Sequence, residues 1–197
     1  MLIFYDLETT GLNQYHDKIT EVCFIKQIML EFNEEKFITL INPEKTIPPI
    51  VTKITGIDQS MVVDKMTFPQ ISDQLLHFIN SESIDKSFLV AHNNDNYDRI
   101  MLTEHFKNIG VDIKQFNWVF LDTLLIAKKL YPQFKKYNLK SLCEQLGVST
   151  LSAHRAEADT IMVKNLYYRM LLDLEKETGI SLKKLIENPQ VVYNYYN

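Results

Sequence analysis

Short runs of apolar and β-branched residues dominate the first forty positions of the chain. Residues 2–7 form an apolar run that reaches the acid Asp6, as a buried strand would. Residues 19–30 and 36–41 are rich in Ile, Val, Phe and Thr, and residues 33–35 between them predict a hairpin turn. The chain is therefore predicted to begin with one strand followed by an antiparallel hairpin.

Beyond residue 48, apolar positions recur with helical spacing. Residues 68–79 carry one apolar stripe, which predicts an amphipathic helix. Further helices are predicted over 49–53, 97–109, 123–130, 139–146 and from about 154 to 177, and strands over 87–91 and 118–121. This order of elements, with hairpin strands first and then strands that alternate with helices, predicts an α/β fold. We expect a mixed β-sheet with antiparallel and parallel strands, flanked by α-helices.

Composition limits the classes of protein to which this chain can belong. The 197 residues carry 21 basic and 25 acidic side chains, a formal net charge of −4, which excludes a protein that coats nucleic acid through bulk positive charge. Cys23 and Cys143 make no disulfide framework, and neither a signal peptide nor a membrane-length apolar stretch is apparent. We therefore expect an intracellular protein, cytoplasmic or nuclear, with no membrane partner.

The chain shows no internal linker, so a single domain is expected over residues 1–187. Residues 188–197 form a tail rich in Tyr and Asn. Such a tail is able to stack on bases, but folding back against the core or disorder is favoured.

The first candidate chemistry is Asp6-Leu7-Glu8, followed by Thr9, Thr10 and Gly11. Residues two apart on a strand point to the same side, so both carboxylates can face one cation. The same tripeptide recurs at 173–175 within a charged helix, where a solvated face explains it. The Thr-Thr-Gly turn offers hydroxyls and backbone N–H groups to a phosphate or a sugar.

Two more candidates lie further along the chain. His92 ends a predicted strand and Asp98 opens a helix. Taken alone, Asp98 is better explained as a charge that stabilises the helix N-terminus, and His92 has a buried core histidine as its alternative. His154 and Asp159 stand five residues apart at the start of the last long helix, so both can face one cleft. The alternative for Asp159 is an ion pair with a surface lysine.

Four carboxylates gathered at neutral pH repel one another unless divalent cations compensate their charge. All-oxygen ligation without cysteine favours Mg²⁺ or Mn²⁺ over zinc. Two such ions about 4 Å apart would hold the attacking and leaving oxygens of a phosphodiester, and one imidazole nearby can accept a proton from water.

Four stretches in the right order carry a family resemblance: FYDLETTGL (4–12), VAHNNDNYD (90–98), LDTLLIAKKLYP (121–132) and AHRAEAD (153–159). From residue 3 to about 172 the chain resembles the DEDDh group of DnaQ-like 3′-to-5′ exonucleases, including the proofreading exonuclease of bacterial replicative DNA polymerases. The resemblance implies an RNase H-like fold and two divalent ions. It assigns the metal ligands to Asp6, Glu8, Asp98 and Asp159, and the general base to His154. A sister group has tyrosine where this chain has Arg155, so the histidine variant fits better.

The resemblance also implies a pocket for the terminal nucleotide. Thr9, Thr10, Gly11 and Leu12 would contact its sugar and base, and the opposite side would be lined by His92, Asn93 and Tyr97. Tyr97 stands where the family usually has phenylalanine. Ile54 belongs to a stretch, 54–57, similar to one that covers the base in relatives, although an ordinary helix end explains it equally. The lysines between 128 and 140 are either a solvated surface or an edge that contacts phosphates.

The expected function is a metal-dependent 3′-to-5′ exonuclease that releases nucleoside 5′-monophosphates from DNA, with the 3′ end of a strand as its partner and a DNA polymerase as a second one. The alternatives are an RNA-trimming exoribonuclease of the same fold and a non-catalytic module that binds nucleic acid or a polymerase. The sequence does not distinguish a DNA substrate from an RNA substrate, because no residue in it can be assigned a contact with a 2′-hydroxyl group.

Overall fold

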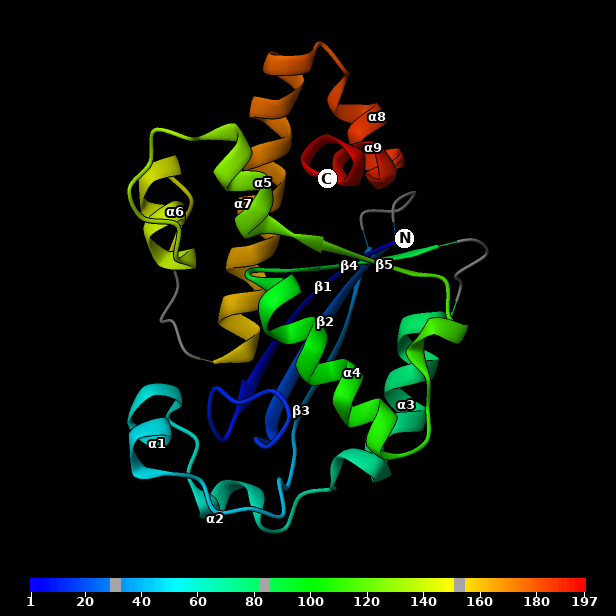
Figure 1. The fold of residues 1–197 in the computed structure, drawn as a ribbon, viewed down its shortest axis with the longest axis vertical. Coiled ribbons are helices and arrows are strands. Elements are labelled where there is room, and N and C mark those ends of the chain that lie inside the picture. The colour runs from blue at the N-terminus through cyan, green and yellow to red at the C-terminus, as the bar shows by residue number, and fades with distance from the viewer. Residues whose placement is uncertain (29–32, 82–85, 151–154) are drawn as a thin grey trace.

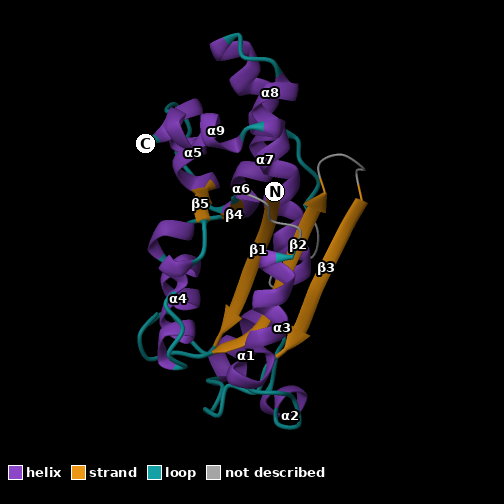
Figure 2. Cartoon of the chain, turned by 90° about the vertical axis from the view of Figure 1, so that its right-hand side faces the viewer, coloured by secondary structure: helices purple, strands orange, loops and turns teal. Residues whose placement is uncertain are grey.

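The computed structural model describes residues 1–28, 33–81, 86–150 and 155–197. One sheet contains β1 (Leu2–Thr9), β2 (Ile19–Ile28), β3 (Asn33–Leu40), β4 (Ser87–Ala91) and β5 (Trp118–Asp122) in the order β3-β2-β1-β4-β5. β2 is antiparallel to both β1 and β3, whereas β4 is parallel to both β1 and β5. The hairpin of β2 and β3 forms one edge of the sheet (Figure 2). The predicted mixed α/β sheet is confirmed.

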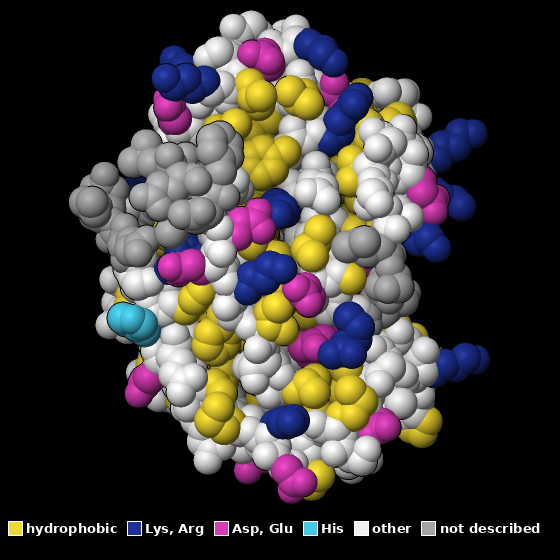
Figure 3. Space-filling view, turned by 180° about the vertical axis from the view of Figure 1, so that it is seen from behind, with side chains coloured by type: hydrophobic (Ala, Val, Ile, Leu, Met, Phe, Trp, Pro, Cys, Tyr) yellow, Lys and Arg dark blue, Asp and Glu magenta, His cyan; other side chains and the backbone are white. Residues whose placement is uncertain are grey.

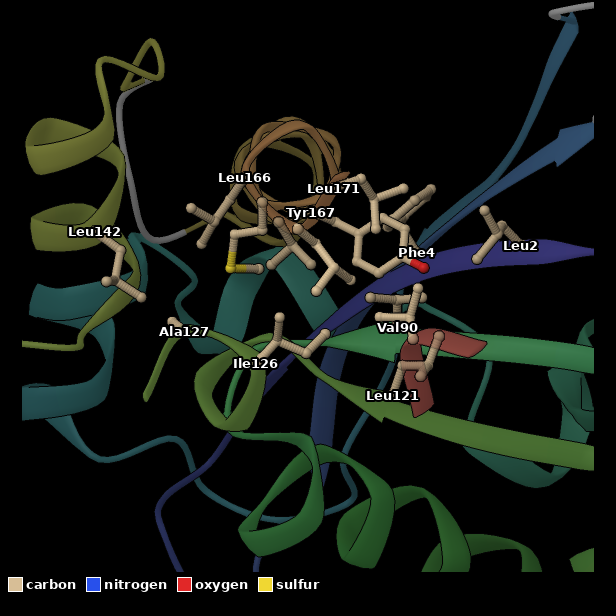
Figure 4. Packing of buried hydrophobic residues seen from close by; sticks show 14 of the residues in the cluster. Leu2, Phe4, Val90, Leu121, Ile126, Ala127, Leu142, Leu166, Tyr167 and Leu171 are labelled. Carbon is tan, nitrogen blue, oxygen red and sulfur yellow. The ribbon is translucent and has the colours of Figure 1, made fainter. Parts of the chain in front are cut away.

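Alternation along β1 divides the core into two layers, because successive side chains of a strand point to opposite faces. Leu2 and Phe4 face the long helix α7 (Ala156–Thr178), where they meet Leu166, Tyr167 and Leu171 (Figure 4). The odd-numbered residues of β1 pack instead against α3 (Phe68–Asn80) and α4 (Asp98–Asn108). The sheet is thus covered by helices on both faces (Figure 1).

The remaining helices are α1 (Pro49–Thr55), α2 (Gln59–Val62), α5 (Thr123–Leu130), α6 (Leu139–Leu146), α8 (Leu182–Glu187) and α9 (Pro189–Tyr196), with 3₁₀ turns at Asn94–Asn96 and Ile113–Gln115. The predicted helices at 123–130 and 139–146 are confirmed at both ends. α2 and α8 were not predicted, since helices of four and six residues are too short to show a periodic stripe. None of the helices within the described residues combines the length and apolar character needed to cross a membrane.

The predicted hairpin turn at residues 33–35 is wrong, because these residues belong to β3. Glu34 pairs with Gln27, and Glu35 pairs with Lys26. The ammonium of Lys26 is buried and donates to Glu35 at 3.0 Å, while Lys164 from α7 lies 2.5 Å from Glu34. Opposite charges therefore stabilise polar residues that have a low strand propensity.

The C-terminal tail folds back onto the core as helix α9. Lys129 on α5 donates to the backbone carbonyl of Tyr195 at 2.5 Å, and its ammonium lies 4.9 Å from the centre of the Tyr195 ring. The hydroxyl of Tyr196 accepts a hydrogen bond from the backbone N–H of Asp122 at the end of β5. These contacts occupy two of the tyrosines considered above for base stacking.

Candidate active site

The candidate site lies where β1 ends and α7 begins (Figure 1). Asp6 and Glu8 are two residues apart on the side of β1 that faces α7, and Asp159 lies in the first turn of that helix. One carboxylate oxygen from each of these three residues lies within 4.8 Å of the others. Three acids from two distant parts of the chain, β1 and α7, are therefore gathered at one point, as a metal site requires.

Asp98 is next to this group but outside the set of three. It opens α4 and is 4% exposed. Burial is the largest cause of the raised pKa of Asp6 and the charge of Asp98 is the next one, so the two carboxylates lie close enough to interact. Backbone N–H groups of Asp98 and Leu7 stabilise the charged form of the Asp98 carboxylate, whereas burial opposes it and raises its pKa. All four predicted acids thus surround the same end of the sheet.

The electrostatics of this cluster favour a cation. Burial raises the pKa of Asp6, and the nearby carboxylates of Asp98, Glu8 and Asp159 raise it further. Burial raises the pKa of Glu8 to about 8, with the charge of Asp159 as the next cause. Partly buried anions at this separation repel one another, so a hard divalent cation with oxygen ligands fits the residues present.

A fifth acid, Glu21 on β2, escaped the sequence analysis. It lies directly opposite Glu8 in the sheet register and is 3% exposed. Its carboxylate accepts hydrogen bonds from Arg155 at 2.6 and 3.1 Å and from the backbone N–H of Ala156 at 3.0 Å. The Glu21 carboxylate therefore stabilises the start of α7 through these hydrogen bonds. Only the pairing of β1 with β2 reveals that it adjoins the site.

Hydrogen bonds from its own side chains stabilise the loop after Glu8. The buried Thr10 hydroxyl donates to Asp17 at 3.0 Å and accepts from the backbone N–H of Lys18 at 3.0 Å. Asp17 also accepts from the backbone N–H of Asn13 at 2.9 Å. A Cβ atom at Gly11 would lie 2.4 Å from an Asp17 carboxylate oxygen, so glycine is needed there for close approach. The Thr10 hydroxyl thus has internal partners, and its contact with a nucleotide stays a prediction.

Tyr97 connects this loop to the start of α4. Its hydroxyl donates to the backbone carbonyl of Gly11 at 2.7 Å and lies 2.6 Å from the hydroxyl oxygen of Thr9. A phenylalanine, which DnaQ-like exonucleases usually have at this position, would lack the hydroxyl that makes these contacts. Leu12 and Ile54 are 85% and 51% exposed, so both apolar side chains are available for a base to pack on.

His92 has an internal partner for each ring nitrogen. Its Nε2 donates to the backbone carbonyl of Tyr137 at 2.8 Å, and its Nδ1 accepts from the hydroxyl of Thr123 at 2.9 Å. Burial lowers the pKa of His92 to about 4, so the ring is neutral at physiological pH. His92 thus joins β4 to α5 and to the segment before α6, and contact with a nucleotide stays a prediction.

Asn93 and Asp122 shape the turn that leads to Asp98. Asn93 adopts a left-handed conformation with φ of 62°, and its backbone N–H donates to Asp122 at 2.9 Å. Asp122 also accepts from the backbone N–H groups of Asp95 and Leu124, so one buried carboxylate fixes both the turn and the start of α5. Asp122 belongs to the stretch 121–132 that carries part of the family resemblance. Its hydrogen bonds to the turn, however, can be recognised only in the folded chain. His154, the predicted general base, falls outside the described residues.

Part of the predicted basic edge is accessible. Lys135, Lys136 and Lys140 are exposed on and just before α6, whereas Lys129 is engaged by α9 as described above. Seen from behind, Lys and Arg side chains project from the edge of the molecule that carries α6 (Figure 3).

Comparison with known proteins settles the family. The exonuclease family model RNase_T matches residues 3–167. The chain belongs to the exonuclease family. DNA polymerase III subunit epsilon of Treponema pallidum (strain Nichols) is 32% identical over 94% of this chain and 87% of its own length. DNA polymerase III PolC-type of Caldanaerobacter subterraneus subsp. tengcongensis is 33% identical over 94% of this chain. The exonuclease chain spans only 12% of that PolC-type relative.

Solved structures agree with this family. Exonuclease X in complex with 5′ overhanging duplex DNA matches with a TM-score of 0.63 and 25% identity, over 95% of this chain and 98% of that one. Exonuclease I matches with a TM-score of 0.77 over 95% of this chain and 43% of that one, and its 18% identity supports the fold alone. The RNase H-like fold and the resemblance to DnaQ-like exonucleases are therefore confirmed.

Proposed function

We propose that the chain is a metal-dependent 3′-to-5′ exonuclease that releases nucleoside 5′-monophosphates from the 3′ end of DNA. The observation that carries the proposal is the group of Asp6, Glu8 and Asp159, whose carboxylates approach within 4.8 Å in a member of the exonuclease family. Asp98 completes the acid set beside them.

The proposed cofactor is a pair of Mg²⁺ or Mn²⁺ ions, held by Asp6, Glu8, Asp98 and Asp159. When bound, such ions stabilise the negative charge that develops on a phosphodiester during hydrolysis. His154 is the proposed general base that accepts a proton from the attacking water, a role that rests on the family resemblance alone.

The proposed nucleotide pocket uses the two sides of the loop after Glu8. Leu12 and Ile54 present apolar surface to the terminal base. The backbone of Thr9, Thr10 and Gly11 contacts the sugar, held in place by the Tyr97 hydroxyl. His92 and Asn93 form the outer wall, His92 through the carbon edge of its ring. Lys135, Lys136 and Lys140 attract the phosphates of the strand.

DNA is the proposed substrate because two relatives are named as components of DNA polymerase III and one structural neighbour was solved with duplex DNA. The same names support a DNA polymerase as partner and the cytoplasm as location. Residues 1–187 form the proposed exonuclease domain, with 188–197 as a short C-terminal extension.

The test is a gel assay with 5′-labelled single-stranded DNA, duplex DNA, mismatched duplex DNA and RNA in the presence of Mg²⁺. The expected product is a ladder that shortens from the 3′ end, strongest on DNA, and that disappears in EDTA. Asp159→Asn should lower the rate about a hundredfold or more, because it removes one metal ligand. Hydrolysis that persists in EDTA would refute the metal assignment, and binding without hydrolysis would favour the non-catalytic module.

The second Asp-Leu-Glu copy supplies a matched control for Asp159→Asn. Asp173 lies on the same helix α7 but contacts Tyr131, Arg169 and Lys176, away from the acid cluster. Asp173→Asn removes the same charge and should retain the wild-type rate. An equal loss in both variants would show that the effect comes from α7 stability and not from the site.

A further inference from the structure

Arg155 is an exposed cation that a buried acid holds in place. One edge of its guanidinium faces Glu21, with Nη2 at 2.6 Å from one carboxylate oxygen and Nε at 3.1 Å from the other. The side chain of Arg155 is 47% exposed, whereas that of Glu21 is 5% exposed. A two-point contact of this kind fixes the plane of the guanidinium more firmly than a single hydrogen bond does.

This cation stands at the margin of the acid cluster. Glu21 is directly opposite Glu8 across β1 and β2, and the charge of Arg155 partly offsets the burial and the neighbouring acids that raise the pKa of Glu8. The backbone carbonyl of Arg155 accepts from the N–H of Asp159, so Arg155 is the N-cap residue of α7 and Asp159 lies in its first turn. The guanidinium therefore lies near Glu8, one of the proposed metal ligands, and the backbone of Arg155 is bonded to that of Asp159, a second one.

The remaining donors of Arg155 are directed away from Glu21. A guanidinium carries five N–H donors, and Glu21 engages only one edge of it. Two other cations near α7 form ion pairs: Lys36 pairs with Glu157 in the first turn of the helix, and Lys164, further along it, pairs with Glu34. Figure 3 shows a face of the molecule on which dark blue basic and magenta acidic side chains lie next to one another at several places. Arg155 differs from both lysines because its acidic partner is buried: the Glu21 side chain is 5% exposed, against 47% for Glu157 and 31% for Glu34.

We propose that Arg155 binds a backbone phosphate of the strand that enters the site, with Glu21 as its positioning residue. This inference rests on the proposed function, because it assigns a further contact to the same substrate. A strand carrying one negative charge per nucleotide must approach a cluster of acids, and a fixed guanidinium beside them offsets that repulsion. Geometry matches as well, since the planar donor fork fits the oxygens of a phosphate.

Salt dependence separates phosphate binding from a purely structural role. The probe is a 5′-fluorescein-labelled single-stranded oligodeoxynucleotide, and the background is Asp159→Asn with Mg²⁺, which keeps the probe intact. Anisotropy at several KCl concentrations gives the slope of log Kd against log [KCl]. Arg155→Gln should weaken binding about tenfold at low salt and reduce the slope by about 0.7, the value for one phosphate contact of a single strand.

Three further variants sharpen the interpretation. Arg155→Lys keeps the charge and should restore the slope, with Kd still raised because a lysine lacks the planar fork. Glu21→Gln should raise Kd without changing the slope, since Arg155 keeps its charge but loses its anchor. Arg169→Gln removes the same charge from a distant turn of α7 and should change neither value. Thermal unfolding checks that each variant folds, and Arg155→Lys carries the test if Arg155→Gln does not.

Each outcome decides the proposal. An unchanged slope and Kd in Arg155→Gln, while the wild-type chain hydrolyses DNA, overturns the phosphate contact and leaves the exonuclease function intact. A reduced slope in a protein that does not hydrolyse DNA supports the contact and rejects the catalytic function. If the chain neither binds nor hydrolyses any probe, both proposals fail.

Discussion

Acid should destabilise this protein through His92, and His92→Gln should remove that sensitivity. The ring is neutral in the folded state because it is buried, donates through Nε2 to the carbonyl of Tyr137 and accepts through Nδ1 from Thr123. Burial is the main cause that opposes protonation, since the Thr123 hydroxyl also lies 3.3 Å from the backbone carbonyl of Ala91 and could donate there while accepting from a protonated Nδ1. The charged form is therefore disfavoured in the folded chain and free to form in the unfolded chain.

The magnitude follows from the two pKa values. Burial lowers the pKa of His92 to about 4, against about 6.5 in an unfolded chain. Between these values the unfolded state binds more protons, so stability is complete above about pH 6.5 and falls as the pH drops toward 4. From about pH 7.5 to about pH 5, linkage gives a loss of about 2 kcal/mol of unfolding free energy from this one residue.

Urea unfolding at these two pH values tests the prediction, with fluorescence of the single tryptophan, Trp118, as the signal. The measured quantity is the change with pH in the free-energy difference between wild type and His92→Gln. This double difference cancels the acid cluster, where raised pKa values stabilise the folded state at low pH.

At neutral pH the variant should be less stable by about 1 kcal/mol, the value of one hydrogen bond. Near pH 5 this deficit should vanish or reverse. The exposed His77 on α3 provides the control, since His77→Gln should keep the wild-type dependence on pH. If the gap between wild type and His92→Gln stays constant from neutral to acidic pH, the ring is not held neutral by the fold and the reasoning fails.

Three further substitutions give separate tests. Tyr97→Phe keeps the ring but removes the hydroxyl bonds to Gly11 and Thr9, and should raise KM for DNA several-fold while kcat stays within about twofold, measured by steady-state hydrolysis. Gly11→Ala places Cβ 2.4 Å from the Asp17 carboxylate, and should lower stability by about 1–2 kcal/mol, whereas Asp17→Ala in the same chain should relieve part of that loss. Tyr167 has a buried hydroxyl without a hydrogen-bond partner among the described residues, so Tyr167→Phe should raise Tm by about 2–4 °C in a thermal melt.

Elements with strong local signals were predicted well. Residues 87–91 were read as a strand and form β4, and 139–146 were read as a helix and form α6, which Asn138 caps and Gly147 ends. Such signals depend on neighbours in the chain, namely apolar periodicity, a capping side chain and a left-handed glycine. Residues 33–35 were misread because the charges that stabilise them come from Lys26 and Lys164, which only the sheet and α7 bring close.

The acids of the site were found for a similar reason. Asp6 and Glu8 end an apolar strand and Asp98 opens a helix, so each stands where a local pattern changes. Glu21 carries no such mark, since its function depends on Arg155, a partner far away in the chain. Asp122 stands between a strand and a helix and caps α5 locally, but its bond to Asn93 appears only in the folded chain. The Tyr97 hydroxyl is a further case, because Phe and Tyr are equivalent to a pattern of apolar residues and differ only when a partner such as Gly11 is in reach.

The order of residue types along the chain by itself predicted the strands, most helices, the four acids and a cation among them. These predictions need only residue types, because apolar side chains favour burial and like charges repel one another in any fold. Tertiary structure alone decided which partners each polar group has: Glu21 beneath Arg155, His92 between Thr123 and Tyr137, and the tail on α5. Hydrogen bonds and ion pairs are short-ranged and directional, so they exist only once the sheet register and the helix positions are set.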